Sequence, residues 1–263
     1  MKNSRTQETR RPQGVASGAL LPHRFFVVPE TPCPYIAGRF ERKLAVALPS
    51  DGGGTLLSQL TRAGFRRSHR FAYRPACQAC SSCVPLRVPV ADFRPSKSQQ
   101  RTAKANAGLS GRFRRARATP EQFDLFRRYL WARHPEGEMS AMDFEAFAAM
   151  LADSSVTSLV YELRDPDGVL RAACLVDRLS DGLSAVYSFY DDDLPARSLG
   201  TQIILSLIGA AQEFSLDHLY LGYWIAETRK MAYKAKFRPF EVLRQGTWQR
   251  VPDTSGPVLI AGR

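Results

Sequence analysis

Residues 156–190, VTSLVYELRDPDGVLRAACLVDRLSDGLSAVYSFY, decide the predicted fold. They hold three apolar runs rich in β-branched and aromatic residues, at 156–163, 169–178 and 183–190. Asp-Pro-Asp-Gly at 165–168 joins the first two runs and Ser-Asp-Gly at 180–182 joins the last two. Both joins have the composition of tight turns. The stretch therefore predicts three consecutive antiparallel strands.

Helices are predicted on both sides of these strands. Upstream, Thr119 and Gln122 flank a proline in a capping box, and Ser140 is expected to open a second helix. Downstream lie a long apolar helix at 199–214, a strand at 218–223 and a helix at 227–236. This order resembles the GNAT acyltransferase fold, in which a splayed pair of strands brings an acyl carrier to an amine. We therefore expect an α+β chain with a GNAT-like transfer domain.

The loop at 197–201, Arg-Ser-Leu-Gly-Thr, stands where GNAT enzymes hold a phosphate of their carrier at a helix N-terminus. Gly200 and Thr201 are the expected contacts, although a second glycine of the coenzyme A signature is replaced by Thr201. The preceding Asp191, Asp192 and Asp193 would repel a polyphosphate. The loop thus disfavours a coenzyme A enzyme and still allows contact with an anion.

All the excess positive charge lies in the first part of the chain. Residues 1–120 carry 22 Lys and Arg against 5 Asp and Glu, while residues 121–263 carry 15 against 20. A surface this basic attracts a polyanion, and nucleic acid is the commonest one; a solvated surface without a partner is the alternative. Ser96 and Gln99 form a capping box for a helix that presents Lys97, Arg101 and Lys104, which we expect to bind RNA.

Four segments are expected: a disordered basic tail at 1–22, a cysteine-bearing domain at 23–108, the transfer domain at 109–250 and a C-terminal tail at 251–263. A strand at 84–90 contains Pro85 and Pro89, which predicts an edge strand at best. No run is apolar enough to span a membrane, and the N-terminus lacks the apolar core of a signal peptide. We therefore expect a cytoplasmic protein with no membrane partner.

Cysteines gather in the first third of the chain. Cys77, Cys80 and Cys83 follow a Cys-x-x-Cys-x-x-Cys pattern, and Cys33 lies apart in sequence. Four thiolates suit tetrahedral zinc or an iron–sulfur cluster, whereas reduced thiols packed in a small domain are the alternative. Cys174 falls inside a predicted strand and is expected in the core.

Several motifs together resemble one enzyme family. They are CPY at 33–35, GFRRS at 64–68, YRPACQACSSCVPLR at 73–87, FRPSKSQ at 93–99, YSFYD at 187–191, SLGT at 198–201, YLGYWI at 220–225 and KMAYKAKFRP at 230–239. This set is similar to the aminoacyl-tRNA–protein transferases of the N-degron pathway, in their short bacterial form.

The resemblance implies that an amino acid is moved from its tRNA to the N-terminal α-amine of a protein that begins with Asp or Glu, which marks the protein for degradation. Leucine is the expected donor and arginine the alternative, and we expect a monomer. The resemblance also implies a cluster on Cys33, Cys77, Cys80 and Cys83, although the transfer itself needs no cofactor. Two rivals stay open, a coenzyme A-dependent acetyltransferase and a non-enzymatic, metal-dependent RNA-binding protein.

Because an aminoacyl ester is already activated, the chemistry needs positioning, loss of one proton and stabilisation of an oxyanion, with no protein nucleophile. Lys230, Tyr233 and Lys234 are expected on one helix face, where they meet phosphate or the ester.

Roles are also expected for both substrates. Tyr223 and Trp224 either stack the terminal adenine or belong to the core. An acidic N-terminal side chain needs a cation, for which the candidates are Arg66, Arg67 and Arg87. Asp191 is the candidate that holds the cationic α-amine, and none of the four histidines is assigned to catalysis.

Overall fold

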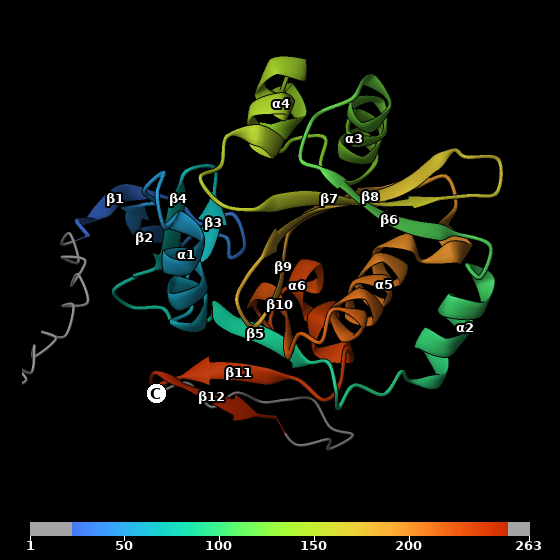
Figure 1. The fold of residues 1–263 in the computed structure, drawn as a ribbon. Helices are drawn as coiled ribbons and strands as arrows, with labels where there is room; N and C mark the ends of the chain where they lie inside the picture. The colour runs from blue at the N-terminus through green and yellow to red at the C-terminus, as the bar shows by residue number, and fades with distance from the viewer. Residues whose placement is uncertain (1–22, 252–263) are drawn as a thin grey trace, which may run out of the picture.

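The structure, a computed structural model, describes residues 23–251, which form two sheets (Figure 1). The smaller sheet has the order β1-β2-β4-β3, with β1 at Phe25–Pro32, β2 at Phe40–Ala47, β3 at Arg66–Ser68 and β4 at Phe71–Pro75. Helix α1 (Gly53–Arg62) contributes Leu56, Leu57 and Leu60 to the core of this part. The tails expected at 1–22 and 251–263 lie outside the described residues, apart from Val251.

The larger sheet has the order β12-β11-β5-β10-β9-β8-β7-β6. Its strands are β5 (Val84–Pro89), β6 (Ser110–Arg115), β7 (Ser158–Arg164), β8 (Leu170–Arg178), β9 (Gly182–Tyr190), β10 (His218–Trp224), β11 (Glu241–Arg244) and β12 (Thr247–Arg250). The three antiparallel strands predicted within 156–190 are β7, β8 and β9. The α+β class is confirmed.

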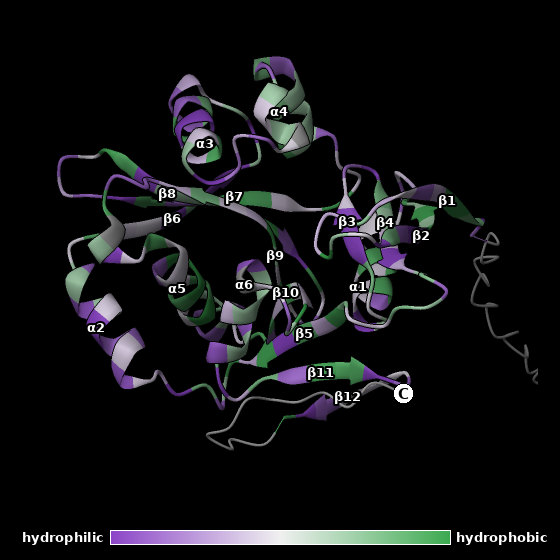
Figure 2. Ribbon diagram, turned by 180° about the vertical axis from the view of Figure 1, so that it is seen from behind, coloured by the Kyte–Doolittle hydropathy of each residue, from purple (hydrophilic) through white to green (hydrophobic). Residues whose placement is uncertain are grey.

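Helices cover both faces of the larger sheet (Figure 1). On one face lie α3 (Pro120–Arg133) and α4 (Phe144–Ala152), and on the other lies α5 (Leu199–Glu213), largely apolar in Figure 2. Helix α2 (Lys97–Ala105) packs beside α5. Among the described helices, none has the length and apolar composition to cross a membrane.

Both predicted capping boxes are present, at the starts of α2 and α3. The predicted start at Ser140 is wrong, because this residue lies in the 3-10 helix η1 (Glu138–Ala141). Helix α4 begins after Asp143, whose carboxylate accepts a hydrogen bond of 2.8 Å from the amide of Ala146. An aspartate so placed satisfies an unpaired amide of the first turn.

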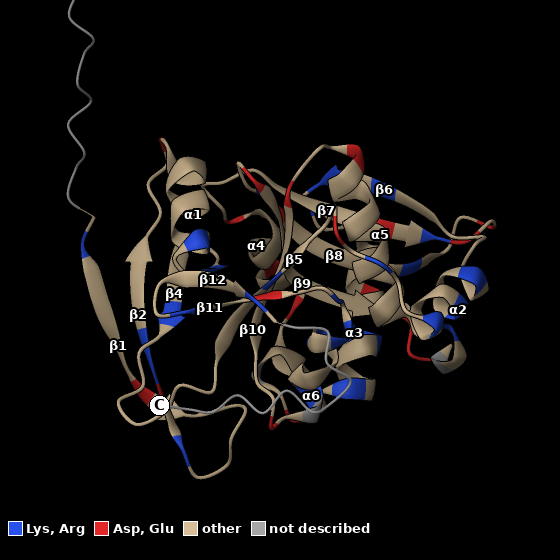
Figure 3. Cartoon of the chain, turned by 90° about the horizontal axis from the view of Figure 1, so that it is seen from below, with Lys and Arg blue, Asp and Glu red and all other residues tan. Residues whose placement is uncertain are grey.

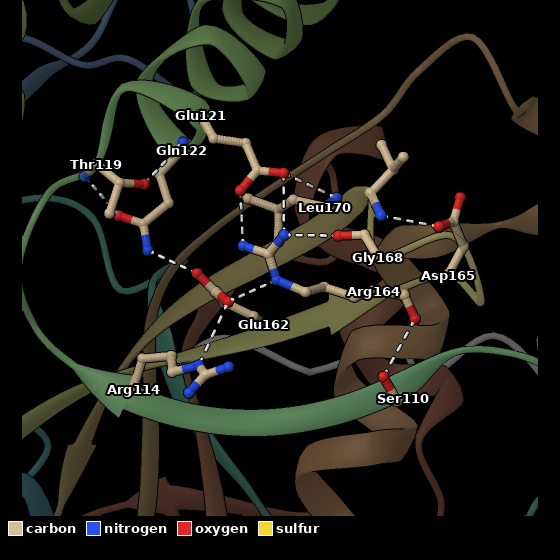
Figure 4. A network of polar contacts seen from close by, with 11 residues as sticks. Ser110, Arg114, Thr119, Glu121, Gln122, Glu162, Arg164, Asp165, Gly168 and Leu170 are labelled. Atoms are coloured by element: carbon tan, nitrogen blue, oxygen red, sulfur yellow. Dashed lines mark hydrogen bonds and ion pairs between the residues drawn. The ribbon is translucent and has the colours of Figure 1, made fainter.

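A polar network fixes the start of α3 on the sheet (Figure 4). The Gln122 amide donates to the nearly buried carboxylate of Glu162 on β7 at 2.8 Å. Arg164 donates to both carboxylate oxygens of Glu121, at 2.9 and 2.7 Å, and to Glu162 at 3.0 Å. The paired polar groups hold α3 in one position on the hairpin of β7 and β8, and α3 in turn carries one wall of the cavity described below.

Strand β5 corrects one sequence-based prediction. It is not an edge strand, because it lies between β10 and β11 inside the larger sheet. β11 pairs with it only at Leu86 and Arg87, between the two prolines, so neither proline has to donate to that neighbour. β5 belongs to the larger sheet, so the two sheets divide between β4 and β5, while the division of the domains at residue 108 stays a prediction.

β9 and β10 form the splayed pair. They are parallel and pair only through Gly182–Ser184 with His218–Tyr220, after which the two strands separate. β10 is irregular at this point, since its register on β5 shifts between Tyr220 and Gly222. The helix expected at 227–236 is broken into α6 (Arg229–Ala232) and the 3-10 helix η3 (Tyr233–Lys236), which follow β10.

Candidate active site

A cavity of about 500 Å³ lies at the end of β9. Its walls come from four parts of the chain. The lining residues include Tyr129 and Arg133 of α3, Tyr190 of β9, Leu199–Thr201 of α5, Lys230 of α6 and Tyr233 of η3. The cavity therefore stands where the splayed strands end, between the helices of the two faces. This is the position expected for an acyl group that must meet an amine.

The first turn of α5 opens on the cavity. Ser198, the residue before the helix, is left-handed with φ 49° and ψ 49°, and its side chain caps no amide. Gly200 packs against the ring of Tyr190, where a Cβ would come within 2.9 Å of a ring carbon. A helix N-terminus with free amides favours a negative charge. The amide of Thr201 already donates to the carbonyl of Ser198 at 2.8 Å, and contact of Gly200 and Thr201 with an anion stays a prediction.

The acidic residues of the cavity are already compensated. Asp191 is buried and accepts from Arg171 at 2.8 Å and from Arg128 at 3.3 Å. Asp192 accepts from Arg133 at 2.6 Å. The expected repulsion of an anion by these carboxylates is therefore offset, and both oxygens of Asp191 already have a cationic partner.

Lys230, Tyr233 and Lys234 do not share one face. Lys230 and Tyr233 line the cavity. Lys234 points into the protein, where it is 5% exposed and its Nζ donates to the carbonyl of Tyr223 at 2.7 Å. Burial, and next the charge of Arg66, hold the pKa of Lys234 well below its ordinary value. The α-helix ends after Ala232, so helical spacing does not extend across the three residues.

Tyr223 and Trp224 belong to the core, each 3% exposed. The Tyr223 hydroxyl donates to the carbonyls of Gly64 and Tyr73 at 3.0 Å, and Trp224 packs near the ring of Phe240. Neither ring has a free face for a base, so the stacking role is not supported. Tyr223 lies beside Tyr73 of the smaller sheet, and Trp224 belongs to the core cluster of the larger sheet, which explains their burial.

The three candidate arginines differ in their partners. Arg67 forms a buried ion pair with Asp177, with Nε–Oδ2 at 2.7 Å and Nη2–Oδ1 at 2.8 Å. Arg87 pairs with Glu241 at 2.7 Å and lies over the ring of Trp248. Arg66 donates through Nη2 to the carbonyls of Ala185 and Val186 on β9, at 3.1 and 2.9 Å. Only Arg66 among these three lacks a carboxylate partner.

The basic residues expected to bind RNA lie on α2. Lys97, Arg101 and Lys104 are exposed. The side-chain amide of Asn106, just beyond the helix, donates to the backbone carbonyl of Arg197 at 2.7 Å. The side-chain amide of Gln99 donates to the backbone carbonyl of Lys236 at 3.1 Å. α2 is therefore attached to two segments beside the cavity, the loop before α5 and η3. Figure 3 shows blue residues along α2 and on α6.

The four candidate metal ligands lie in two loops, with Cys33 between β1 and β2 and Cys77, Cys80 and Cys83 between β4 and β5. Burial, followed by Cys33, Cys80 and Cys77, raises the pKa of Cys83 to about 12. An Arg39 Nη donates to Cys80 at 3.2 Å, and hydrogen bonds, above all from the backbone of Ser82, lower the pKa of that thiol. Within residues 23–251, no set of three ligands is close enough together to hold a metal. The fifth cysteine, Cys174, is buried in the core as expected.

Some cavity residues were not singled out from the sequence, among them Tyr129, Arg133, His134 and Tyr190. Burial, next Lys230 and then Arg133, lower the pKa of His134. Tyr129 and Tyr190 pack together with ring centroids 4.8 Å apart. Tyr190 belongs to the YSFYD motif at 187–191. The sequence of α3 predicts only an amphipathic helix, and no local pattern indicates that the C-terminal end of this helix reaches β9.

Comparison with known proteins decides the family. Residues 31–101 match the family model "Arginine-tRNA-protein transferase, N terminus", and residues 121–244 match "Arginine-tRNA-protein transferase, C terminus". The aspartate/glutamate leucyltransferase of Granulibacter bethesdensis is 49% identical over 228 residues, 87% of this chain and 85% of the relative. The protein of that name from Paramagnetospirillum magneticum is 47% identical over 235 residues, 89% and 96% of the two chains.

The chain belongs to the arginine-tRNA-protein transferase family. The predicted class of enzyme, an aminoacyltransferase that works with tRNA and protein substrates, is thereby confirmed. The coenzyme A-dependent and non-enzymatic alternatives are set aside. A solved structure, that of L-PGS from Bacillus licheniformis, is a more distant likeness, with a TM-score of 0.47 and 12% identity over 64% of this chain and 58% of that one.

Proposed function

We propose that this enzyme transfers leucine from Leu-tRNA to the N-terminal α-amine of proteins that begin with Asp or Glu. The observation that best supports this proposal is the chemical character of the side chains that line the cavity. Tyr129, Tyr190 and Leu199 give it apolar surface, and the two carboxylates that line it, Asp191 and Asp192, are already paired with arginines. A leucine side chain suits such walls, whereas an arginine side chain would find no unpaired carboxylate among the described lining residues. The shared name of the relatives, aspartate/glutamate leucyltransferase, supports the same donor and acceptors.

The proposed chemistry uses positioning and charge. The 3′ end of the tRNA enters the cavity, and its phosphate lies near Lys230 and the first turn of α5. The α-ammonium group of the acceptor loses one proton to water, and the resulting amine attacks the ester carbon. The ester C–O bond then breaks, a second proton passes from the nitrogen to the ribose oxygen, and the ribose leaves with a free hydroxyl. Tyr233 and Lys230 lie beside the reacting ester, where a hydroxyl donor and a cation stabilise the negative charge that develops on oxygen.

We propose that the RNA continues over α2. Lys97, Arg101 and Lys104 supply exposed positive charge there, and the hydrogen bonds of Gln99 and Asn106 keep this helix next to the cavity. Such contacts neutralise backbone phosphates without reading sequence. The enzyme is proposed to act as a monomer in the cytoplasm, where charged tRNA is available.

We also propose that Cys33, Cys77, Cys80 and Cys83 bind zinc or an iron–sulfur cluster. Four thiols in two neighbouring loops form a donor set that both groups accept. The electrostatic interaction of Cys83 with the other three supports their proximity, and the loops would have to close further on the group. A bound metal would tie the two loops together; it takes no part in the transfer.

The decisive assay offers Leu-tRNA and Arg-tRNA separately to peptides that begin with Asp, Glu, Arg or Lys. We expect leucine on the Asp and Glu peptides only. Transfer of arginine to these peptides, with no transfer of leucine, would make the protein an arginyl enzyme. A Lys230→Met variant serves as the active-site control, and we expect it to be slower with both acceptors.

A further inference from the structure

Arg66 fills the gap between the splayed strands. It comes from β3, in the other sheet, and its Nη2 binds two carbonyls of β9. On the side of β10 it meets Gly222, whose φ is 71° and where a Cβ would overlap the guanidinium. The glycine is therefore needed both for its backbone conformation and for the space that Arg66 occupies. The position of Arg66 is determined by the fold.

A second cation lies close by without an anionic partner. Lys234 lies near Arg66, because its Nζ donates to the carbonyl of Tyr223, the residue that follows the Gly222 in contact with Arg66. Within the described part of the chain, neither Arg66 nor Lys234 forms an ion pair with a carboxylate, although the adjacent Arg67 is fully paired with Asp177. Lysine is rarely buried without a partner, and an anion bound between Arg66 and Lys234 would favour the charged form of the buried amine.

Arg66 and Lys234 adjoin residues that line the cavity without lining it themselves: Arg66 binds the carbonyl of Val186, two residues before the lining residue Ser188, and Lys234 follows the lining residue Tyr233. An acceptor whose α-amine reaches the ester in the cavity carries its first side chain only one carbon away from that amine. The side-chain carboxylate of an N-terminal Asp or Glu would then have to pass between β9 and η3 to reach Arg66.

We propose that Arg66 and Lys234 form the subsite that binds the side-chain carboxylate of the acceptor's N-terminal residue. The inference rests on the proposed function and adds how the acceptor is selected. Nη2 of Arg66 is held by β9, which leaves Nη1 to donate to one oxygen of a carboxylate. Lys234 supplies a second donor. A fork of two donors accepts both Asp and Glu, and an uncharged side chain leaves both cations without an anion.

The test compares peptides that begin with Asp or Asn, and with Glu or Gln, which have nearly the same shape and differ in charge. For the wild type we expect a strong preference for the acids in kcat/KM. In Arg66→Gln the preference should fall by roughly 10- to 100-fold, the loss of a charged hydrogen bond. The KM for Leu-tRNA should stay unchanged. Arg74→Gln, which alters an exposed arginine of β4, is the matched control and should keep the wild-type preference.

Lys234→Met provides a second test in case Arg66→Gln does not fold, because an apolar side chain of similar length suits a buried position. It should also weaken the preference for Asp over Asn. If a folded Arg66→Gln or Lys234→Met enzyme is slower but keeps the full preference, the two residues only support the strands and the proposal is overturned. A wild-type enzyme that transfers no leucine to Asp or Glu peptides would instead refute the proposed function.

Discussion

Reversal of two charges on α2 tests where the tRNA binds. Arg101 and Lys104 are exposed, and α2 is held in place by Gln99 and Asn106, so Arg101→Glu/Lys104→Glu should fold normally. If each residue neutralises one phosphate, the slope of log affinity against log salt should decrease by about 0.9 for each lost contact, or about 1.8 in all. Between 50 and 200 mM salt, the wild type should then lose about 10-fold more affinity than the variant.

The assay is fluorescence anisotropy with labelled tRNA at the two salt concentrations. The matched control reverses Arg115 and Arg117, which are both exposed. Arg115 lies on β6 and pairs with Leu159 of β7, and the row of residues that continues from this pair across β8 reaches β9 away from Tyr190 and the cavity. An unchanged affinity and slope in the α2 variant would refute the reasoning. A loss found instead in Lys230→Glu/Lys236→Glu would move the RNA surface to the segment of α6 and η3.

Three further predictions concern stability, metal and catalysis. Arg67→Met should destabilise the protein by about 3–5 kcal/mol, because it leaves Asp177 buried without its cation, and the melting temperature should drop by roughly 6–20 °C. In calorimetry, the double variant Arg67→Met/Asp177→Leu should recover most of this lost stability. If the losses from the two substitutions are strictly additive, the account is contradicted. Cys77→Ser/Cys80→Ser should lose the zinc or iron that elemental analysis finds after anaerobic purification, and wild-type protein free of both metals yet fully active would end the metal proposal. Gly200→Ala should lower kcat at least about 10-fold, since a Cβ meets the Tyr190 ring and moves the first turn of α5; an unchanged kcat would show that this turn does not position the substrate.

Local signals in the sequence predicted much of the second part. The capping boxes at Ser96 and Thr119 and the turn sequences between β7, β8 and β9 depend on neighbours within a few residues, so a single sequence suffices to find them. Strand β5 was misjudged because its place depends on β10 and β11, more than a hundred residues away. Its prolines fit an interior strand only because β11 pairs with the two residues between them.

Site residues were harder to predict for the same reason. Lys230 and Lys234 look equivalent in sequence, but the helix ends between them and one faces the cavity while the other is buried. The adjacent Arg66 and Arg67 also look alike, and alternation along β3 sends Arg67 to Asp177 of β8 and Arg66 to the carbonyls of β9. Their different roles follow from tertiary contacts that the sequence pattern does not contain.

The central claim is that leucine is the donor and an N-terminal acid the acceptor. The most direct measurement incubates the enzyme with equal amounts of Leu-tRNA and Arg-tRNA and one peptide that begins with Asp, followed by mass spectrometry of the peptide. The account predicts a mass increase of one leucine residue, with the new residue at the N-terminus and no arginine product. A peptide that gains arginine, or one that stays unchanged while the tRNAs remain charged, would contradict it.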